Sequence, residues 1–179
     1  ATTSNLARIR GADDVLVCVG ASGTVIRSIN RGATFATTAV APTTSGLQAL
    51  EVFSQKRIWV GSVNGYMWYT LDGGKTWTRK GFNGEGTGQV FDILFVTEEI
   101  GYMLHGNATP TARLFFTLDG GATFTNTGWR LTNWPTFNYA KRIAAPVSSD
   151  SAVNVNNVAI AGITSVNDGV LLLGIAQKL

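Results

Sequence analysis

Two stretches of the chain carry nearly the same octet. Residues Thr70–Trp77 read TLDGGKTW, and residues Thr117–Phe124 read TLDGGATF, beginning 47 positions later. A weaker copy, SINRGATF at residues Ser28–Phe35, begins 42 positions before the first. Self-similarity at a spacing of roughly 20–50 residues is typical of proteins built from repeated supersecondary units. The octet therefore predicts an architecture of repeated units.

The sequence around each octet repeats as well. A β-rich run that ends in small residues precedes each copy, at Leu16–Gly20, Ile58–Gly61 and Tyr102–Gly106. A fourth such run, Val158–Gly162, is followed by a glycine-bounded apolar string but by no octet. The sequence predicts a single domain of four repeats, at roughly residues 6–42, 43–87, 88–135 and 136–179.

Each repeat is expected to contain short strands separated by turns. In the second repeat, the expected strands are Leu47–Phe53, Arg57–Gly61, Gly65–Thr70 and Thr76–Lys80. No segment shows the 3.6-residue period of an amphipathic helix. Four strands in about 45 residues is the size of one β-propeller blade. We therefore expect an all-β fold, a small β-propeller of about four blades; a β-sandwich is the alternative, but it would not explain an octet that recurs at blade spacing.

The octet resembles the Asp-box, or BNR repeat, of sialidase, sortilin and photosystem II assembly-factor propellers. Two copies are complete, whereas the first has Asn30 in place of the aspartate. The resemblance implies that these turns brace the blades and lie away from the substrate face. The residues that carry it are Asp72, Gly74, Thr76 and Trp77; Asp119, Gly121, Thr123 and Phe124; and Asn30, Gly32, Thr34 and Phe35.

The chemistry of the octet favours a structural role. A carboxylate such as that of Asp72 can accept hydrogen bonds from backbone N–H groups in its own turn, as an Asx turn does. Glycines supply the positive φ angles that a tight turn needs. The threonine begins the outgoing strand, and the aromatic residue can pack between neighbouring units. The alternative is that Asp72 and Asp119 serve catalysis or bind calcium.

Composition excludes several classes of protein. The chain has 179 residues, of which 45% are hydrophobic and 14% charged, and its net charge is +3. Its positive charges are scattered, so we expect no nucleic-acid partner, and no apolar run is long enough for membrane insertion. The chain has a single cysteine, Cys18, and a single histidine, His105. We therefore expect no internal disulfide, no zinc site and no other cofactor. No secretory signal pattern is visible, so the compartment is unassigned; an extracellular or virion-exposed position fits the composition.

Two carboxylates are candidates for a site near the propeller axis. Glu51 and Asp92 lie within expected inner strands and could point into a central channel. Glycoside hydrolysis needs two carboxylates across the scissile bond, and a sialidase also needs a cluster of three arginines and a Tyr–Glu pair. We recognise no such set, and we favour a channel-lining role in which the carboxylates pair with arginine or water. The chain is therefore expected not to be an enzyme.

Exposed aromatic residues are the other candidates. The segment Gly128–Phe137 is expected to be a long connection, and its Trp129, Arg130 and Trp134 could contact a protein partner or a glycan. Packing between the third and fourth units is an equal alternative. His105 is expected to be a satisfied or surface histidine, and Cys18 a buried, inert thiol.

These observations favour a non-catalytic binding or structural module. Examples are a building block of a virus particle or surface appendage, or an adhesion module. The alternatives are a glycan-binding lectin or sialidase-like glycosidase, and an assembly factor resembling the photosystem II type. The fourth repeat stops after its third strand, which leaves Val170–Gln177 as a bare edge that invites pairing. We therefore expect a protein partner or self-association, with a glycan as a further possibility.

Overall fold

The structure of the protein is a computed structural model that describes residues 3–38, 41–82, 85–106, 112–131, 141–144, 157–163 and 170–176. Nearly all of these residues lie in β-strands and tight turns, and the only helical element in these ranges is the 3₁₀ turn η1 (Ala21–Gly23). Within the same ranges, no helix is long and apolar enough to cross a membrane. The predicted all-β class is confirmed.

The strands form four antiparallel sheets, which we call blades 1 to 4. Each blade takes its strands from one continuous stretch of the chain, in sequence order. Blade 1 contains β1 (Leu6–Ala12), β2 (Val15–Gly20), β3 (Val25–Ser28) and β4 (Ala36–Thr37). Blade 2 contains β5 (Leu47–Val52), β6 (Ile58–Ser62), β7 (Met67–Thr70) and β8 (Thr78–Lys80). Blade 3 contains β9 (Gln89–Phe95), β10 (Gly101–Gly106), β11 (Ala112–Thr117) and β12 (Thr125–Leu131). Blade 4 contains β13 (Lys141–Ala144), β14 (Asn157–Ile163) and β15 (Val170–Ala176).

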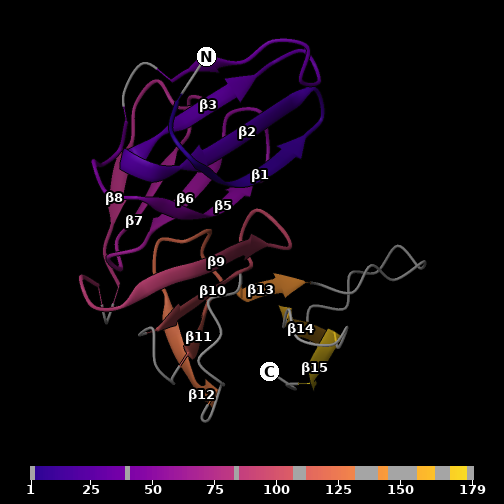
Figure 1. Ribbon diagram of the computed structural model, residues 1–179. Coiled ribbons are helices and arrows are strands. Elements are labelled where there is room, and N and C mark those ends of the chain that lie inside the picture. Colours follow the sequence, from indigo (N-terminus) through magenta and orange to yellow (C-terminus); the bar gives the residue numbers. More distant parts are fainter. Residues whose placement is uncertain are drawn as a thin grey trace.

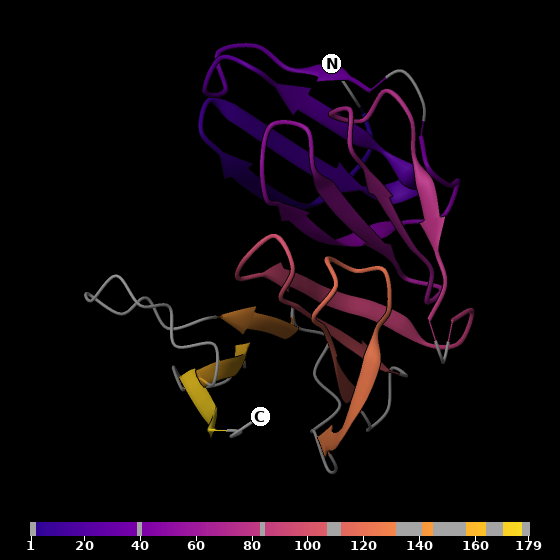
Figure 2. The ribbon, with the colours of Figure 1, turned by 180° about the vertical axis from the view of Figure 1, so that it is seen from behind.

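The blades follow one another around the molecule (Figures 1 and 2). The first strands of blades 1, 2 and 3 are neighbours in space, since β1 contacts β5 and β5 contacts β9. This radial succession of small sheets, each with its first strand innermost, is the arrangement of a β-propeller. Charged residues on these first strands therefore come together at the centre of the molecule.

Apolar side chains fill the spaces between successive blades. One buried cluster, which includes Val17, Leu47 and Val60, lies between blades 1 and 2. A second, which includes Trp59, Ile93 and Phe115, lies between blades 2 and 3. Side chains alternate between the two faces of a strand, so each blade can contribute to the cluster on either side of it.

Blades 2 and 3 approach each other closely at a glycine, where no side chain separates the two sheets. Gly61 lies on β6, and a Cβ atom placed on it would be 2.4 Å from Cγ1 of Val90 on β9. No real Cβ atom comes that close to another carbon, so this position requires glycine. The glycine noted near the end of the second strand of this repeat thus has a packing role.

Some strands begin later than the sequence predicts. Thr76 and Thr123 were expected to open the outgoing strands, but β8 begins at Thr78 and β12 at Thr125. The backbone N–H groups of both threonines donate to an aspartate side chain within the turn, so they are not available to a neighbouring strand. Similarly, the N–H of Arg57 donates to Oγ of Ser54, and β6 begins one residue later.

Blade 4 has three strands in the described part of the chain. β15 pairs with β14 on one side, and the sheet ends there. This matches the expected order of strands in the fourth repeat. Whether another chain covers β15 stays a prediction, as does the assignment of the four repeats to a single domain.

Candidate functional site

The octets form the turns between the third and fourth strands of blades 1, 2 and 3. In blade 2, Oδ1 of Asp72 accepts from the N–H of Thr76 at 2.9 Å and from the hydroxyl of Thr70 at 2.7 Å. Oδ2 of Asp72 accepts from the hydroxyl of Thr76 at 2.6 Å. Oγ1 of Thr70 also accepts from the N–H of Gly74 at 2.9 Å. One carboxylate and one hydroxyl therefore hold the turn closed.

Blade 3 repeats this network around Asp119. Its Oδ1 accepts from the N–H of Thr123 at 2.8 Å and from the hydroxyl of Thr117 at 2.7 Å. These bonds stabilise the ionised carboxylate, and they lower the pKa of Asp119 to about 2, the hydroxyl of Thr123 contributing most. The hydroxyl of Thr76 likewise lowers the pKa of Asp72 well below its usual range.

Asn30 keeps the network in blade 1 but reverses one bond. Its Oδ1 accepts from the N–H of Thr34 at 2.9 Å and from the hydroxyl of Ser28 at 2.8 Å, as the aspartates do. Its Nδ2, however, donates to Oγ1 of Thr34 at 2.9 Å, where the aspartates accept from a threonine hydroxyl. The hydroxyl rotates to suit either partner, so the turn tolerates the uncharged residue.

The first hydroxyl of the octet was not singled out from the sequence. Ser28, Thr70 and Thr117 are at most 2% exposed, and each accepts the N–H of the octet's fifth residue, a glycine. The signal was present, because a serine or threonine occupies this position in all three copies.

The aromatic residue of the octet packs on the preceding blade. Phe124 of blade 3 is 8% exposed, and its ring centroid lies 6.0 Å from that of Trp59 in blade 2. Trp77 packs against the cluster between blades 1 and 2. Phe35 differs from the expectation, because it is 41% exposed. Its octet belongs to blade 1, which has no preceding blade along the described chain.

Among the side chains that the structure describes, four charged ones meet at the centre of the molecule. Arg8 on β1 forms an ion pair with Asp92 on β9, and Nη2 of Arg8 donates to the carbonyl oxygen of Phe91 at 3.2 Å. Arg10 lies 3.5 Å from the same Asp92 oxygen. Asp92 is fully buried, and it is held by two arginines from a blade that is not adjacent to its own.

Glu51 on β5 lies in the same cluster. It is 7% exposed, and its Oε1 accepts from the N–H of Phe95 at 3.3 Å. Burial raises the pKa of Glu51 to about 7, although Arg10 acts in the opposite direction. The structure thus brings together the two carboxylates that the sequence singled out, and it adds Arg8 and Arg10, which the sequence did not assign to a site. Ion pairs of this kind hold the inner strands together. The carboxylate of Asp92 is therefore already bound by arginine side chains.

The other sequence candidates are dispersed. Trp129 and Arg130 lie within β12, so the expected long connection after Gly128 is wrong for these two residues; Trp134 lies outside the described residues. Their contact with a partner or a glycan stays a prediction.

His105 is 4% exposed, and its Nε2 lies 2.6 Å from the carbonyl oxygen of Thr87, while burial lowers its pKa. Cys18 is buried, and burial raises the pKa of its thiol. In the described ranges, no group of three His, Cys, Asp or Glu side chains is placed to hold a metal ion.

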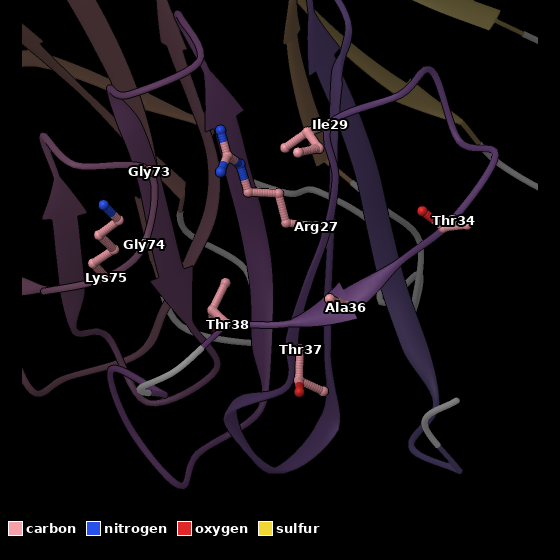
Figure 3. Close-up of a pocket in the computed structure, with 9 residues that line it drawn as sticks. All are labelled: Arg27, Ile29, Thr34, Ala36, Thr37, Thr38, Gly73, Gly74 and Lys75. Atoms are coloured by element: carbon pink, nitrogen blue, oxygen red, sulfur yellow. The ribbon is translucent and has the colours of Figure 1, made fainter.

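Two grooves lie beside the octet turns, one at the boundary of blades 1 and 2 and one at the boundary of blades 2 and 3. The first groove, about 370 Å³, lies between blade 1 and the octet turn of blade 2 (Figure 3). It is lined by Arg27, Ile29, Thr34, Ala36, Thr37, Thr38, Gly73, Gly74 and Lys75. The second groove, about 680 Å³, lies between blade 2 and the octet turn of blade 3. It is lined by Arg57, Trp59, Tyr69, Leu71, Lys80, Glu98, Glu99 and the turn 118–122.

An exposed aliphatic side chain occupies the second position of every octet. Ile29 is 67% exposed, Leu71 is 63% exposed and Leu118 is 54% exposed. We call these three residues the aliphatic row. Ile29 lines the first groove, and the other two line the second. The row was not recognised from the sequence, although an aliphatic residue at the same place in three turns was a visible signal.

Comparisons with protein-family models and with curated protein sequences give no match. Among solved structures, an ancestral GH74 enzyme is 14% identical with a TM-score of 0.70, and the match covers 88% of this chain and 22% of that one. The GH74 xyloglucanase from Xanthomonas campestris is 15% identical with a TM-score of 0.58, over 91% of this chain and 27% of the enzyme.

A structure described as YCF48 bound to D1 peptide is 16% identical with a TM-score of 0.61, over 89% of this chain and 51% of that one. The chain therefore spans about a quarter of the GH74 proteins and about half of YCF48. At these identities the likenesses establish the architecture alone. The chain has a β-propeller fold.

Proposed function

We propose that this chain is a non-catalytic structural module that associates with further copies of itself in a larger assembly, such as a virus particle or a surface appendage. The observation that carries the proposal is the aliphatic row. Three large aliphatic side chains, 54–67% exposed, recur at equivalent positions beside two grooves. Leu71 and Leu118 line the same groove, and exposed apolar side chains gathered at one place typically mark an interaction site.

The aliphatic row has no role in the turn itself. The hydrogen bonds of the blade 2 octet use the side chains of Thr70, Asp72 and Thr76, and none uses that of Leu71. A polar side chain at Leu71 would close the turn equally well and would be better solvated. An apolar residue in all three copies is therefore better explained by contact with another protein surface.

An enzymatic role is less well supported. The GH74 proteins with a similar fold are enzymes by name, but a glycosidase needs two carboxylates able to reach a substrate. Asp92 is fully buried and paired with Arg8, and Glu51 is nearly buried. Membership of the Asp-box family is likewise a proposal, supported by the hydrogen-bond networks of the octet turns. The peptide bound to YCF48 is consistent with protein recognition by a related fold.

Light scattering across a concentration series tests the proposal. We expect the wild-type chain to form species larger than a monomer, and the triple variant Ile29→Ser, Leu71→Ser and Leu118→Ser to remain monomeric with an unchanged circular dichroism spectrum. The matched control is Val63→Ser, which removes an aliphatic side chain that is 42% exposed but outside the row. A wild-type chain that stays monomeric at the highest concentration would contradict self-association.

A further inference from the structure

The charged residues that the structure describes along the lining of the first groove are both cations, Arg27 and Lys75. Among the described residues, neither forms an ion pair, and Nε of Arg27 is buried without a hydrogen-bond partner. Nη2 of Arg27 donates to the carbonyl oxygen of Gln55 at 2.9 Å, which fixes the guanidinium against the turn at Gly73. The groove therefore presents a positioned cation that is only partly satisfied.

The two cations come from different blades but face the same region. Figure 3 shows Arg27 extending from β3 and Lys75 from the octet turn of blade 2, with their nitrogen atoms toward the same end of the groove. Thr37 and Thr38 lie toward the other end of that view. Ile29 lies near the cationic end and supplies the apolar part of the lining. A ligand of this groove should combine negative charge with an apolar group.

The same chain carries a surface with that combination. The turn between β9 and β10 contains Glu98 and Glu99, which are exposed and form no ion pair within the described residues. It lies at the second groove, beside the exposed side chain of Leu118. The N–H of Gly120 donates to the carbonyl oxygen of Glu99 at 2.8 Å, so the acidic turn and the octet turn of blade 3 form one unit.

We propose that the acidic turn of one copy, Glu98–Glu99 together with Leu118, docks in the first groove of a second copy, against Arg27, Lys75 and Ile29. Carboxylates then meet uncompensated cations, and an aliphatic side chain meets an aliphatic side chain. This inference rests on the proposed self-association, and it identifies the two surfaces that meet.

The contact joins two different surfaces of the same chain. The groove lies at the boundary of blades 1 and 2, whereas the acidic turn lies at the boundary of blades 2 and 3. When two copies join through unlike surfaces, one copy keeps a free groove and the other keeps a free acidic turn. Further copies can therefore add at both ends, which gives a ring or an open chain of subunits.

Charge exchange tests this contact. The groove variant carries Arg27→Glu and Lys75→Glu, and the turn variant carries Glu98→Lys and Glu99→Lys. Each variant alone brings like charges together, so we expect its association to weaken about tenfold or more by sedimentation velocity. An equimolar mixture pairs opposite charges at every contact, and we expect it to regain association with the two variants alternating.

The mixture is its own control, because it contains the same substitutions as the separate samples. If either double variant has a lowered melting temperature, the single variants Lys75→Glu and Glu99→Lys replace the pair. Association that persists in the variants alone, or that is not regained on mixing, overturns the docking while leaving self-association intact. A monomeric wild-type chain overturns both proposals.

Discussion

At the scale of single residues, the three octets show that the shape of the turn does not depend on a charged side chain at the third position. Asn30 makes the same contacts as Asp72 and Asp119, and only the direction of the bond to the threonine hydroxyl is reversed. The geometry of the turn therefore needs an acceptor oxygen at this position. The negative charge strengthens the bonds but is not required for them.

We predict that Asp119→Asn keeps most of the thermal stability and that Asp119→Ala lowers the melting temperature further. Alanine removes the acceptor of the Thr123 N–H and of two hydroxyl groups, whereas asparagine retains the oxygen. Thermal unfolding followed by circular dichroism measures the difference. Asp14→Ala, which removes an exposed carboxylate outside the octets, is the control. Equal melting temperatures for the two Asp119 variants would mean that the acceptor oxygen retained by asparagine does not stabilise the turn.

Glu51 is predicted to make stability depend on pH. Its pKa is about 7 in the folded chain, against an ordinary value of 4.5. Between those pH values the folded chain retains a proton that the unfolded chain releases, so the stability present below pH 4.5 is lost as pH rises through 7. The free energy of unfolding should fall by on the order of 3 kcal/mol over this range because of Glu51.

Urea unfolding at pH 4.5, 6 and 8 measures this effect as the difference between wild type and Glu51→Gln. His105, whose pKa burial lowers, adds a slope of opposite sign to both proteins, so the difference isolates Glu51. Parallel profiles for wild type and Glu51→Gln would show that the pKa of Glu51 is the same in the folded and the unfolded chain.

At the scale of strands and turns, the sequence was sufficient where local chemistry decides the structure. The recurring octet predicted three turns and the strands on either side of them. Strand ends at Thr76 and Arg57 were wrong by one or two residues, because side-chain acceptors within the turns hold the N–H groups of those residues. The extension of β12 through Trp129 and Arg130 was missed, since nothing in the local sequence distinguishes a long edge strand from a connection.

The close approach of blades 2 and 3 gives a prediction at this scale. Gly61→Ala places a Cβ atom 2.4 Å from Val90, so the two sheets must separate. We expect a loss of about 1–3 kcal/mol in the free energy of unfolding, measured with urea. Gly46→Ala is the matched control, because its nearest neighbour would be 3.7 Å away, an ordinary contact. Equal stabilities of the two variants would contradict the tight packing at Gly61.

At the scale of the whole molecule, the central charges connect blades that are distant in sequence. Arg8 and Asp92 are 84 positions apart, and no local pattern predicts that they pair. The sequence did suggest that carboxylates on inner strands would meet arginines, because inner strands converge in a propeller. It could not identify which arginines, since that depends on the register and angle of three sheets.

Breaking this central pair is predicted to destabilise the entire fold. Arg8→Met removes the arginine that pairs with the fully buried Asp92 and, among the ion pairs of the described residues, leaves the more distant Arg10, at 3.5 Å. Removing one partner of a buried ion pair typically costs about 3–5 kcal/mol. Chemical unfolding should show this loss as a single transition. Arg31→Met, which breaks the exposed pair with Asp14, should change stability little.

Asn30 also affects the electrostatic potential of the surface. Its partner Thr34 lines the first groove together with Arg27 and Lys75, so an aspartate at position 30 would add a negative charge next to the lining of that groove. The hydrogen-bond network shows that the turn would accept that charge, as it does in blades 2 and 3. Asn30→Asp should therefore keep the melting temperature and weaken self-association, measured by the same light-scattering series. Asn30 thus keeps the shape of its turn without adding a negative charge, so the potential that an approaching subunit meets at the groove stays more positive than it would with an aspartate.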